Sequence, residues 1–195
     1  MIEVETPQGT ARAHLHEDEA PRALLVLGHG AGGGVTAPDL VTATTAAEES
    51  GVSVALVEQP YRVAGRRTPA PARQLDAAWL AVVEQLRGEA PLLVGGRSAG
   101  ARVACRTAAE TGAAGVLCLA FPLHPPGRPE KSRLAELEAL DVPVLVVQGE
   151  RDPFGTPPSA PGRTLAVVAG DYGLKADRGA IATAVGDWLA AVLPA

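Results

Sequence analysis

The stretch that decides the fold is LLVGGRSAGARVA, Leu92–Ala104. It begins as an apolar run, which is typical of a strand buried on both faces, and ends in small residues that suit a helix. Between them, Gly96-Arg97-Ser98-Ala99-Gly100 has the pattern G-x-S-x-G. On a sharp strand-to-helix turn this pattern exposes a nucleophilic serine, and the flanking glycines avoid a collision. We therefore predict that Ser98 is a nucleophile; an ordinary glycine-rich turn with a serine N-cap is the other interpretation.

The rest of the chain alternates apolar runs with helical patterns. Strands are expected over residues 22–30, 52–60, 91–96, 115–121, 142–152 and 164–170, helices over 36–50, 71–87, 98–110, 132–140 and 177–193, and loops over 61–70, 122–131 and 153–163. Two further runs around Pro7 and Gly9 predict an N-terminal β-hairpin. This alternation indicates a single α/β domain over residues 1–195, with a mostly parallel sheet and helices on both of its faces.

Composition excludes several classes of protein. The formal net charge of −5, from 22 acidic and 17 basic residues, argues against a nucleic-acid binder. The N-terminus has no signal-peptide pattern, and no apolar run approaches the roughly 18 residues of a membrane helix. The two cysteines, Cys105 and Cys118, are expected to be buried thiols in a reducing cytosol. We therefore expect a cytoplasmic protein without membrane contact, while its oligomeric state stays open.

The carboxyl ends of the other strands supply further site residues, because ligands bind at that edge of a parallel sheet. A serine nucleophile needs donors for the oxyanion, and a hydrolase of this type takes them from the residue after the serine and from an earlier loop. Here these are Ala99 and either Gly30 or Ala31. Asp152, at the end of a later strand, is suited to orient a histidine, or else is a turn residue before Pro153.

The combination of motifs resembles a known superfamily. LGHGAGG (27–33), GGRSAGARVA (95–104), FPLHPPGRPEK (121–131) and LVVQGERDPFG (145–155) look like a small branch of the α/β-hydrolases that lacks a cap domain. The branch is similar to dienelactone-hydrolase-like proteins and to the hydrolase-like domain in a subunit of a eukaryotic histone-acetyltransferase complex. The resemblance covers residues 20–193.

The resemblance implies an α/β-hydrolase fold and a serine hydrolase acting on small ester or related acyl substrates. It also implies Ser98 as nucleophile and Asp152 as the acid of a catalytic triad. The oxyanion hole would come from Gly30 or Ala31 together with Ala99. No metal and no organic cofactor is implied.

The base of the triad departs from the family pattern. The histidine should follow the last strand, where this chain has Asp171-Tyr172-Gly173. Tyr172 therefore takes its position, and a phenol, with an ordinary pKa of roughly 10, is a poor base near pH 7. Either hydrolysis is impaired, or Tyr172 is an altered position in an active enzyme, or the protein is a non-catalytic binding or scaffold module.

The chain has only four histidines, and none of them follows Asp152. His124 is the alternative base, although a loop histidine bonded to the backbone is the simpler interpretation. His29 is expected to hold the oxyanion loop by hydrogen bonding. His14 and His16 are expected on one face of an edge strand, in solvent.

Two further interpretations concern ligands. Arg62, Arg66, Arg67, Arg97 and Arg102 are expected near the same edge of the sheet, and Arg62 and Arg97 are candidates to bind an anionic substrate. Surface ion pairs with acidic residues are the other interpretation. Gly28-x-Gly30-x-x-Gly33, with Glu58 at the end of the next strand, also matches a dinucleotide-binding pattern.

Overall fold

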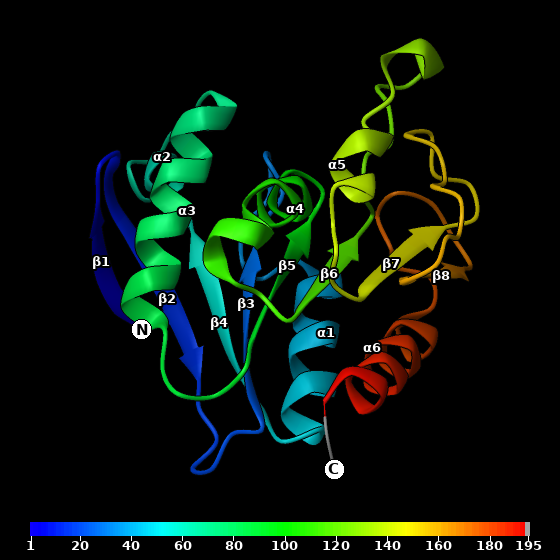
Figure 1. Cartoon of the computed structure of the whole chain (residues 1–195). Helices are drawn as coiled ribbons and strands as arrows, with labels where there is room; N and C mark the ends of the chain where they lie inside the picture. The colour runs from blue at the N-terminus through cyan, green and yellow to red at the C-terminus, as the bar shows by residue number, and fades with distance from the viewer. Residues whose placement is uncertain (194–195) are drawn as a thin grey trace.

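A sheet of eight strands runs through the computed structural model, which describes residues 1–193 (Figure 1). The strand order is β1-β2-β4-β3-β5-β6-β7-β8. The strands are β1 (Ile2–Thr6), β2 (Gly9–His16), β3 (Ala23–Gly28), β4 (Val52–Glu58), β5 (Leu92–Arg97), β6 (Gly115–Leu119), β7 (Val144–Gly149) and β8 (Arg163–Val168). Strand β2 is antiparallel to β1 and β4, and the other pairs are parallel. The predicted hairpin and mostly parallel sheet are confirmed.

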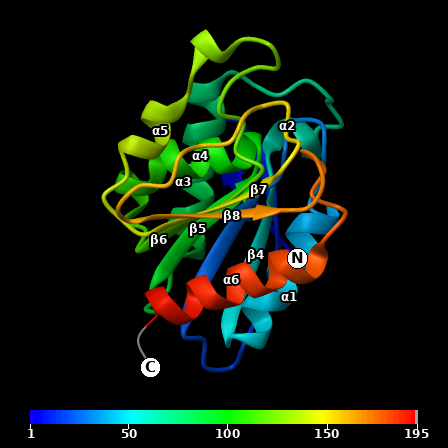
Figure 2. The same ribbon diagram turned by 90° about the vertical axis from the view of Figure 1, so that its right-hand side faces the viewer.

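Helices cover both faces of the sheet, as predicted (Figure 2). On one face lie α1 (Pro38–Glu49) and α6 (Arg178–Val192), and on the other lie α3 (Ala72–Leu86), α4 (Ala99–Thr111) and α5 (Leu134–Glu138). Each face has its own core of Ala, Val and Leu side chains around one buried tryptophan, Trp79 or Trp188. Within residues 1–193, no helix combines the length and apolarity needed to cross a bilayer.

Short helical segments occur where sequence patterns predicted loops. The expected loop over residues 61–70 overlaps α2 (Pro60–Val63), and the loop over 122–131 contains a 3₁₀ turn at Pro129–Lys131. Both segments have proline at their first helical position, where the fixed φ of proline favours a helical turn. Neither segment has enough residues to show a helical repeat in the sequence.

The environment of two histidines also differs from the prediction. Strand β2 is internal, since it lies between β1 and β4, so His14 and His16 do not belong to an edge strand. His14 Nε2 lies 3.1 Å from a Glu58 carboxylate oxygen, and His16 Nδ1 lies 2.9 Å from one of Glu48. The acidic partners come from distant parts of the chain, which is why sequence spacing did not reveal them.

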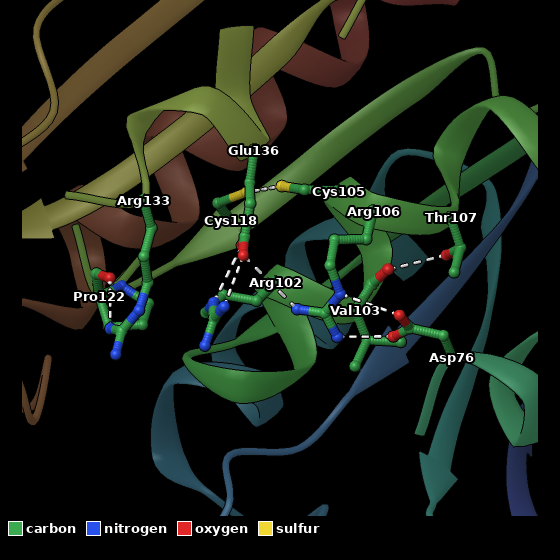
Figure 3. A network of polar contacts seen from close by, with 10 residues as sticks. All are labelled: Asp76, Arg102, Val103, Cys105, Arg106, Thr107, Cys118, Pro122, Arg133 and Glu136. Carbon is green, nitrogen blue, oxygen red and sulfur yellow. Dashed lines mark hydrogen bonds and ion pairs between the residues drawn. The ribbon is translucent and has the colours of Figure 1, made fainter. Parts of the chain in front are cut away.

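Ion pairs join α4 to the helices on its two sides (Figure 3). Arg106 Nε donates to Asp76 of α3 at 2.9 Å, and Arg102 Nε donates to Glu136 of α5 at 2.9 Å. Arg102 therefore belongs to this network and not to a ring of site arginines. Beneath it, Cys105 and Cys118 are free and buried, with 3.5 Å between their sulfur atoms. The expectation of two buried thiols is confirmed.

Candidate active site

Ser98 lies on a sharp turn between β5 and α4. Its φ of 52° and ψ of −107° are unusual for a residue with a side chain. Such a backbone conformation persists only where its surroundings hold it, and it is concentrated at functional sites. Here the Ser98 N–H donates to Leu119 O at 2.9 Å, and the Ser98 carbonyl accepts from Arg102 N–H at 3.1 Å. The turn is thus anchored to β6 on one side and to the first turn of α4 on the other.

The two glycines that flank the turn are needed for close packing against β3. A Cβ at Gly96 would lie 2.4 Å from the carbonyl oxygen of Gly28, and one at Gly100 would lie 2.3 Å from the same atom. Real Cβ atoms do not approach backbone so closely. The sequence pattern predicted a collision at these positions, and the structure identifies Gly28 as the group that would be struck.

The loop after β3 is held by two aromatic side chains. His29 Nδ1 and Gly30 O are 2.8 Å apart, and His29 Nε2 accepts the Gln59 N–H at 3.1 Å. Tyr61 donates its hydroxyl to Ala31 O at 2.9 Å. Burial lowers the pKa of His29, so the ring is neutral at pH 7, with Nδ1 as the donor. His29 therefore holds the loop, as expected, and both of its nitrogens are already occupied.

Gly30 of this loop faces the serine turn. A Cβ there would lie 3.7 Å from Ser98 Cβ and 3.2 Å from Arg97 Nη1. Helix α4 begins at Ala99, directly after Ser98, and its first N–H groups have no partner inside the helix. The predicted oxyanion residues Gly30, Ala31 and Ala99 therefore come from two segments that meet at Ser98.

Tyr172 reaches Ser98 from the loop after β8. Its hydroxyl donates a short hydrogen bond to Ser98 Oγ, across 74 positions of sequence. Its ring packs against Phe154, with 4.5 Å between ring centroids, and against the Arg97 guanidinium, whose carbon lies 4.5 Å from the centroid. Tyr172, which the sequence analysis expected at the position of the base, is therefore in contact with the serine.

Asp152 lies at the end of β7, but its carboxylate is bonded elsewhere. Oδ1 accepts the Phe154 N–H at 2.8 Å, and Oδ2 accepts from Gln148 Nε2 at 2.7 Å. Burial raises the pKa of Asp152, against the opposing effects of the Phe154 N–H and the Arg97 charge. The bond to Phe154 is the turn interaction that the sequence also allowed. Gln148, which sequence reasoning missed, is fully buried beneath this loop.

His124 is bonded to its own loop. Its Nδ1 lies 2.9 Å from the carbonyl oxygen of Pro125, and its ring packs so closely on Gly155 that a Cβ there would lie 2.4 Å from Nε2. Within residues 1–193, no hydrogen bond joins His124 to Ser98. These contacts agree with the interpretation of His124 as a loop histidine bonded to the backbone.

Arg97 lies at the centre of a polar cluster that sequence patterns did not reveal. Its Nε lies 2.8 Å from Asp39 Oδ2, and its Nη2 donates to the Tyr172 carbonyl at 2.9 Å. Asp39 is fully buried in the first turn of α1. Burial raises the pKa of Asp39, and the nearby Arg97 charge counteracts part of that effect. The sequence has no spacing that links residue 39 to residue 97.

A cavity of about 360 Å³ opens beside Tyr172. Its lining comes from the oxyanion loop, the start of α1 and the loop after β8, namely Ala31, Gly32, Gly33, Ala37, Pro38, Asp39, Arg97, Tyr172, Gly173 and Lys175. Arg62 does not line it and lies instead on α2, where its charge acts on His29. A larger cavity, of about 740 Å³, lies near Leu24 and Ser53 at the amino ends of the parallel strands, and so away from Ser98.

The glycines of the dinucleotide-like pattern have other neighbours. Gly28 lies against Gly100 of the serine turn, and a Cβ there would be 3.2 Å from both Gly100 Cα and the Trp79 ring. Helix α1 begins only at Pro38, beyond Gly33, whereas the nucleotide pattern places its last glycine at the helix start. Glu58 pairs with His14. These contacts account for Gly28 and Glu58 without a nucleotide.

Comparisons with known proteins agree with this geometry. Residues 21–167 match the family model described as an alpha/beta hydrolase domain. No curated protein matches the sequence. Among solved structures, a serine hydrolase without a lid from Xanthomonas campestris is 19% identical, with a TM-score of 0.80 over 100% of this chain and 94% of that one.

Two more solved structures share the fold. Est1E from Butyrivibrio proteoclasticus, with bound ferulic acid, is 15% identical, with a TM-score of 0.80 over 98% of this chain and 99% of that one. Dienelactone hydrolase from Anabaena variabilis is 14% identical, with a TM-score of 0.78 over 99% and 97% of the two chains. At these identities the likeness establishes the fold, and the chemistry has to be argued from the site.

Proposed function

Because the chain belongs to the alpha/beta hydrolase domain family, we propose that it is a serine hydrolase acting on small esters or related acyl compounds. The observation that carries the proposal is the Ser98 hydroxyl, held on a strained turn at the carboxyl edge of the sheet. Ala99 follows it directly in the chain, and Gly30 lies close to it in space, since a Cβ at Gly30 would be 3.7 Å from Ser98 Cβ. We expect the protein in the cytoplasm, in keeping with its two free thiols.

In the proposed reaction, Ser98 Oγ attacks the ester carbonyl carbon. The N–H groups of Ala99 and of Gly30 or Ala31 stabilise the oxyanion that forms. The group in contact with Ser98 Oγ is the Tyr172 side-chain oxygen, which in its phenolate form accepts the serine proton. The phenol then protonates the leaving alkoxide, and water hydrolyses the acyl-enzyme by the reverse proton transfers. A phenol is a poor general base near pH 7, so turnover there is slow.

The cavity beside Tyr172 is the proposed site of the acyl group. Of the two arginines that sequence analysis favoured for an anionic substrate, Arg62 does not line the cavity, and Arg97 is paired with Asp39. Lys175 lines the cavity and is exposed. We therefore assign the recognition of an anionic acyl group to Lys175.

A second candidate function is a non-catalytic binding protein. It is favoured by one contact, because the group against Ser98 Oγ is the phenol of Tyr172 and not an imidazole. A phenol is a poor general base near pH 7, so in that arrangement the serine has no effective base beside it. The same cavity would then bind an acyl compound without cleaving it.

Two assays separate the candidates. Short-chain p-nitrophenyl ester hydrolysis and labelling by a fluorophosphonate probe are measured for the parent protein, Ser98→Ala and His124→Ala. The hydrolase proposal expects slow turnover and labelling that Ser98→Ala abolishes and His124→Ala leaves in place. Loss of turnover in His124→Ala as well would assign the base to His124. Equal signals in the parent and Ser98→Ala would favour the binding protein.

A further inference from the structure

We propose that the Asp39–Arg97 ion pair holds the Tyr172 hydroxyl on Ser98, so that both are positioning residues for the proposed reaction. The catalytic importance of this positioning rests on the proposed function. The positioning gives Asp39 and Arg97, which come from α1 and β5, the orienting role that a triad acid has toward its histidine.

Arg97 contacts Tyr172 in two ways at once. Its Nη2 donates to the Tyr172 backbone carbonyl at 2.9 Å, which fixes the loop. Its guanidinium carbon lies 4.5 Å from the centroid of the ring, which fixes the side chain. A guanidinium over an aromatic ring is attracted by the ring's negative face. One arginine thus restrains both the backbone and the ring of the residue that touches Ser98.

Asp39 in turn fixes Arg97. The carboxylate of Asp39 is fully buried, the Arg97 side chain is 16% exposed, and Nε lies 2.8 Å from Oδ2. The other carboxylate oxygen of Asp39 accepts the Leu40 N–H at 3.0 Å, which ties the acid to the start of α1. Breaking a buried pair leaves one charge without a partner, so neither side chain can swing away at low cost. The guanidinium is therefore held against Tyr172.

Asp152 does not perform this role in the structure. Both of its oxygens accept hydrogen bonds from nearby residues, one from the side chain of Gln148 in β7 and one from the Phe154 N–H in the loop after β7. Gln148 also donates to the carbonyls of Phe121 and Gly155, which fixes the amide in place. Within residues 1–193, no hydrogen bond joins Asp152 to Tyr172.

The experiment reads the Tyr172 ring directly and does not require activity. The chain has two tyrosines, so protein made with ring-labelled ¹³C-tyrosine gives two hydroxyl-bearing carbon resonances, which Tyr61→Phe assigns. Ser98→Ala marks the shift caused by losing the bond to Oγ. Arg97→Met and Asp39→Asn are expected to move the Tyr172 resonance in the same direction, and Arg97→Lys, which keeps the charge, to move it less.

Arg102→Met is the matched control, because Arg102 is also a half-buried arginine near the serine turn but pairs with Glu136. It should leave the Tyr172 resonance in place. An unchanged Tyr172 resonance in folded Arg97→Met would overturn the proposal, as would an equal shift in Arg102→Met. If Arg97→Met fails to fold, Asp39→Asn and Arg97→Lys carry the test, since both conserve side-chain size and hydrogen bonding more closely.

Kinetics then connect the positioning role to catalysis. In Asp39→Asn and Arg97→Lys, kcat for a p-nitrophenyl ester should fall about tenfold to a hundredfold, as small misplacements of a catalytic group do, while KM changes less than about threefold. A rise in KM at constant kcat would contradict positioning. If Ser98→Ala leaves ester hydrolysis unchanged, the proposed function fails. The resonance experiment still decides whether Arg97 holds Tyr172.

Discussion

The Tyr172 hydroxyl is hydrogen-bonded to Ser98 Oγ, where the proposed reaction requires a base. The surrounding elements of the site, namely the strained turn, the oxyanion loop and the adjoining cavity, are those a serine hydrolase requires. Under the proposed function, Tyr172 therefore determines whether this site turns over an ester or only binds it.

Replacing Tyr172 by histidine should increase activity. A well-placed general base contributes about a hundredfold to ten-thousandfold to the rate, so Tyr172→His should raise kcat/KM for p-nitrophenyl acetate at pH 7.5 by about a hundredfold or more. Tyr172→Phe is the control, since it removes the hydroxyl and adds no base. The gain must vanish in the double variant with Ser98→Ala, and a gain that survives there would show that another nucleophile is at work.

The close packing of the serine turn predicts a contrast between two glycines. Gly100→Ala would push a Cβ to 2.3 Å from Gly28 O and should lower the free energy of unfolding by about 2 to 3 kcal/mol, as overpacking does. Gly186→Ala, in α6, meets nothing within 4 Å and should raise it by about 0.5 to 1 kcal/mol, because alanine loses less backbone entropy. Urea unfolding measures both. If both variants lowered the free energy of unfolding by similar amounts, close packing at Gly100 would not be the cause of the destabilisation.

Buried His29 predicts a particular pH dependence of stability. Burial lowers its pKa, so the unfolded chain binds the proton more readily. The contribution of the neutral ring is fully present above about pH 6.5 and is lost as the pH falls through the lowered folded pKa. His29→Asn should be less stable than the parent at pH 7.5, because a buried bond is lost. The difference should narrow by pH 5, as measured by urea unfolding.

The other histidines are present in both the parent and His29→Asn, so their contributions to the pH dependence of the unfolding free energy cancel. A difference in unfolding free energy that stays constant between pH 7.5 and pH 5 would contradict a buried neutral His29. A difference that widens would mean that the ring is protonated in the folded protein.

The two buried thiols should resist modification in the native protein. The contact with Cys105, followed by burial, raises the pKa of Cys118 well above its ordinary value, and only a thiolate reacts quickly. With Ellman's reagent at pH 8, the folded protein should show almost no reaction, and both thiols should react in 8 M urea. Fast reaction of one thiol in the folded protein would show that the region between α4 and β6 opens readily.

The sequence by itself determined the order of the elements, because apolar runs and helical periodicity are local properties. It also placed Ser98, Gly96 and Gly100 on a turn, since a tight strand-to-helix connection restricts residue types within five consecutive positions. The position of Tyr172 after the last strand followed from element order in the same way.

Only the tertiary structure decided which of these groups touch. In the folded protein Tyr172 contacts Ser98, and Asp39 pairs with Arg97. The Asp152 carboxylate accepts hydrogen bonds from Gln148 and Phe154 and none from Tyr172 within the described residues. Each of these contacts, apart from the Asp152 bonds, joins side chains that are far apart in the sequence, so no local spacing encodes it. Their geometry is set by how α1, β5 and the loop after β8 pack together, because hydrogen bonds and ion pairs form only where the folded backbone brings donor and acceptor within reach.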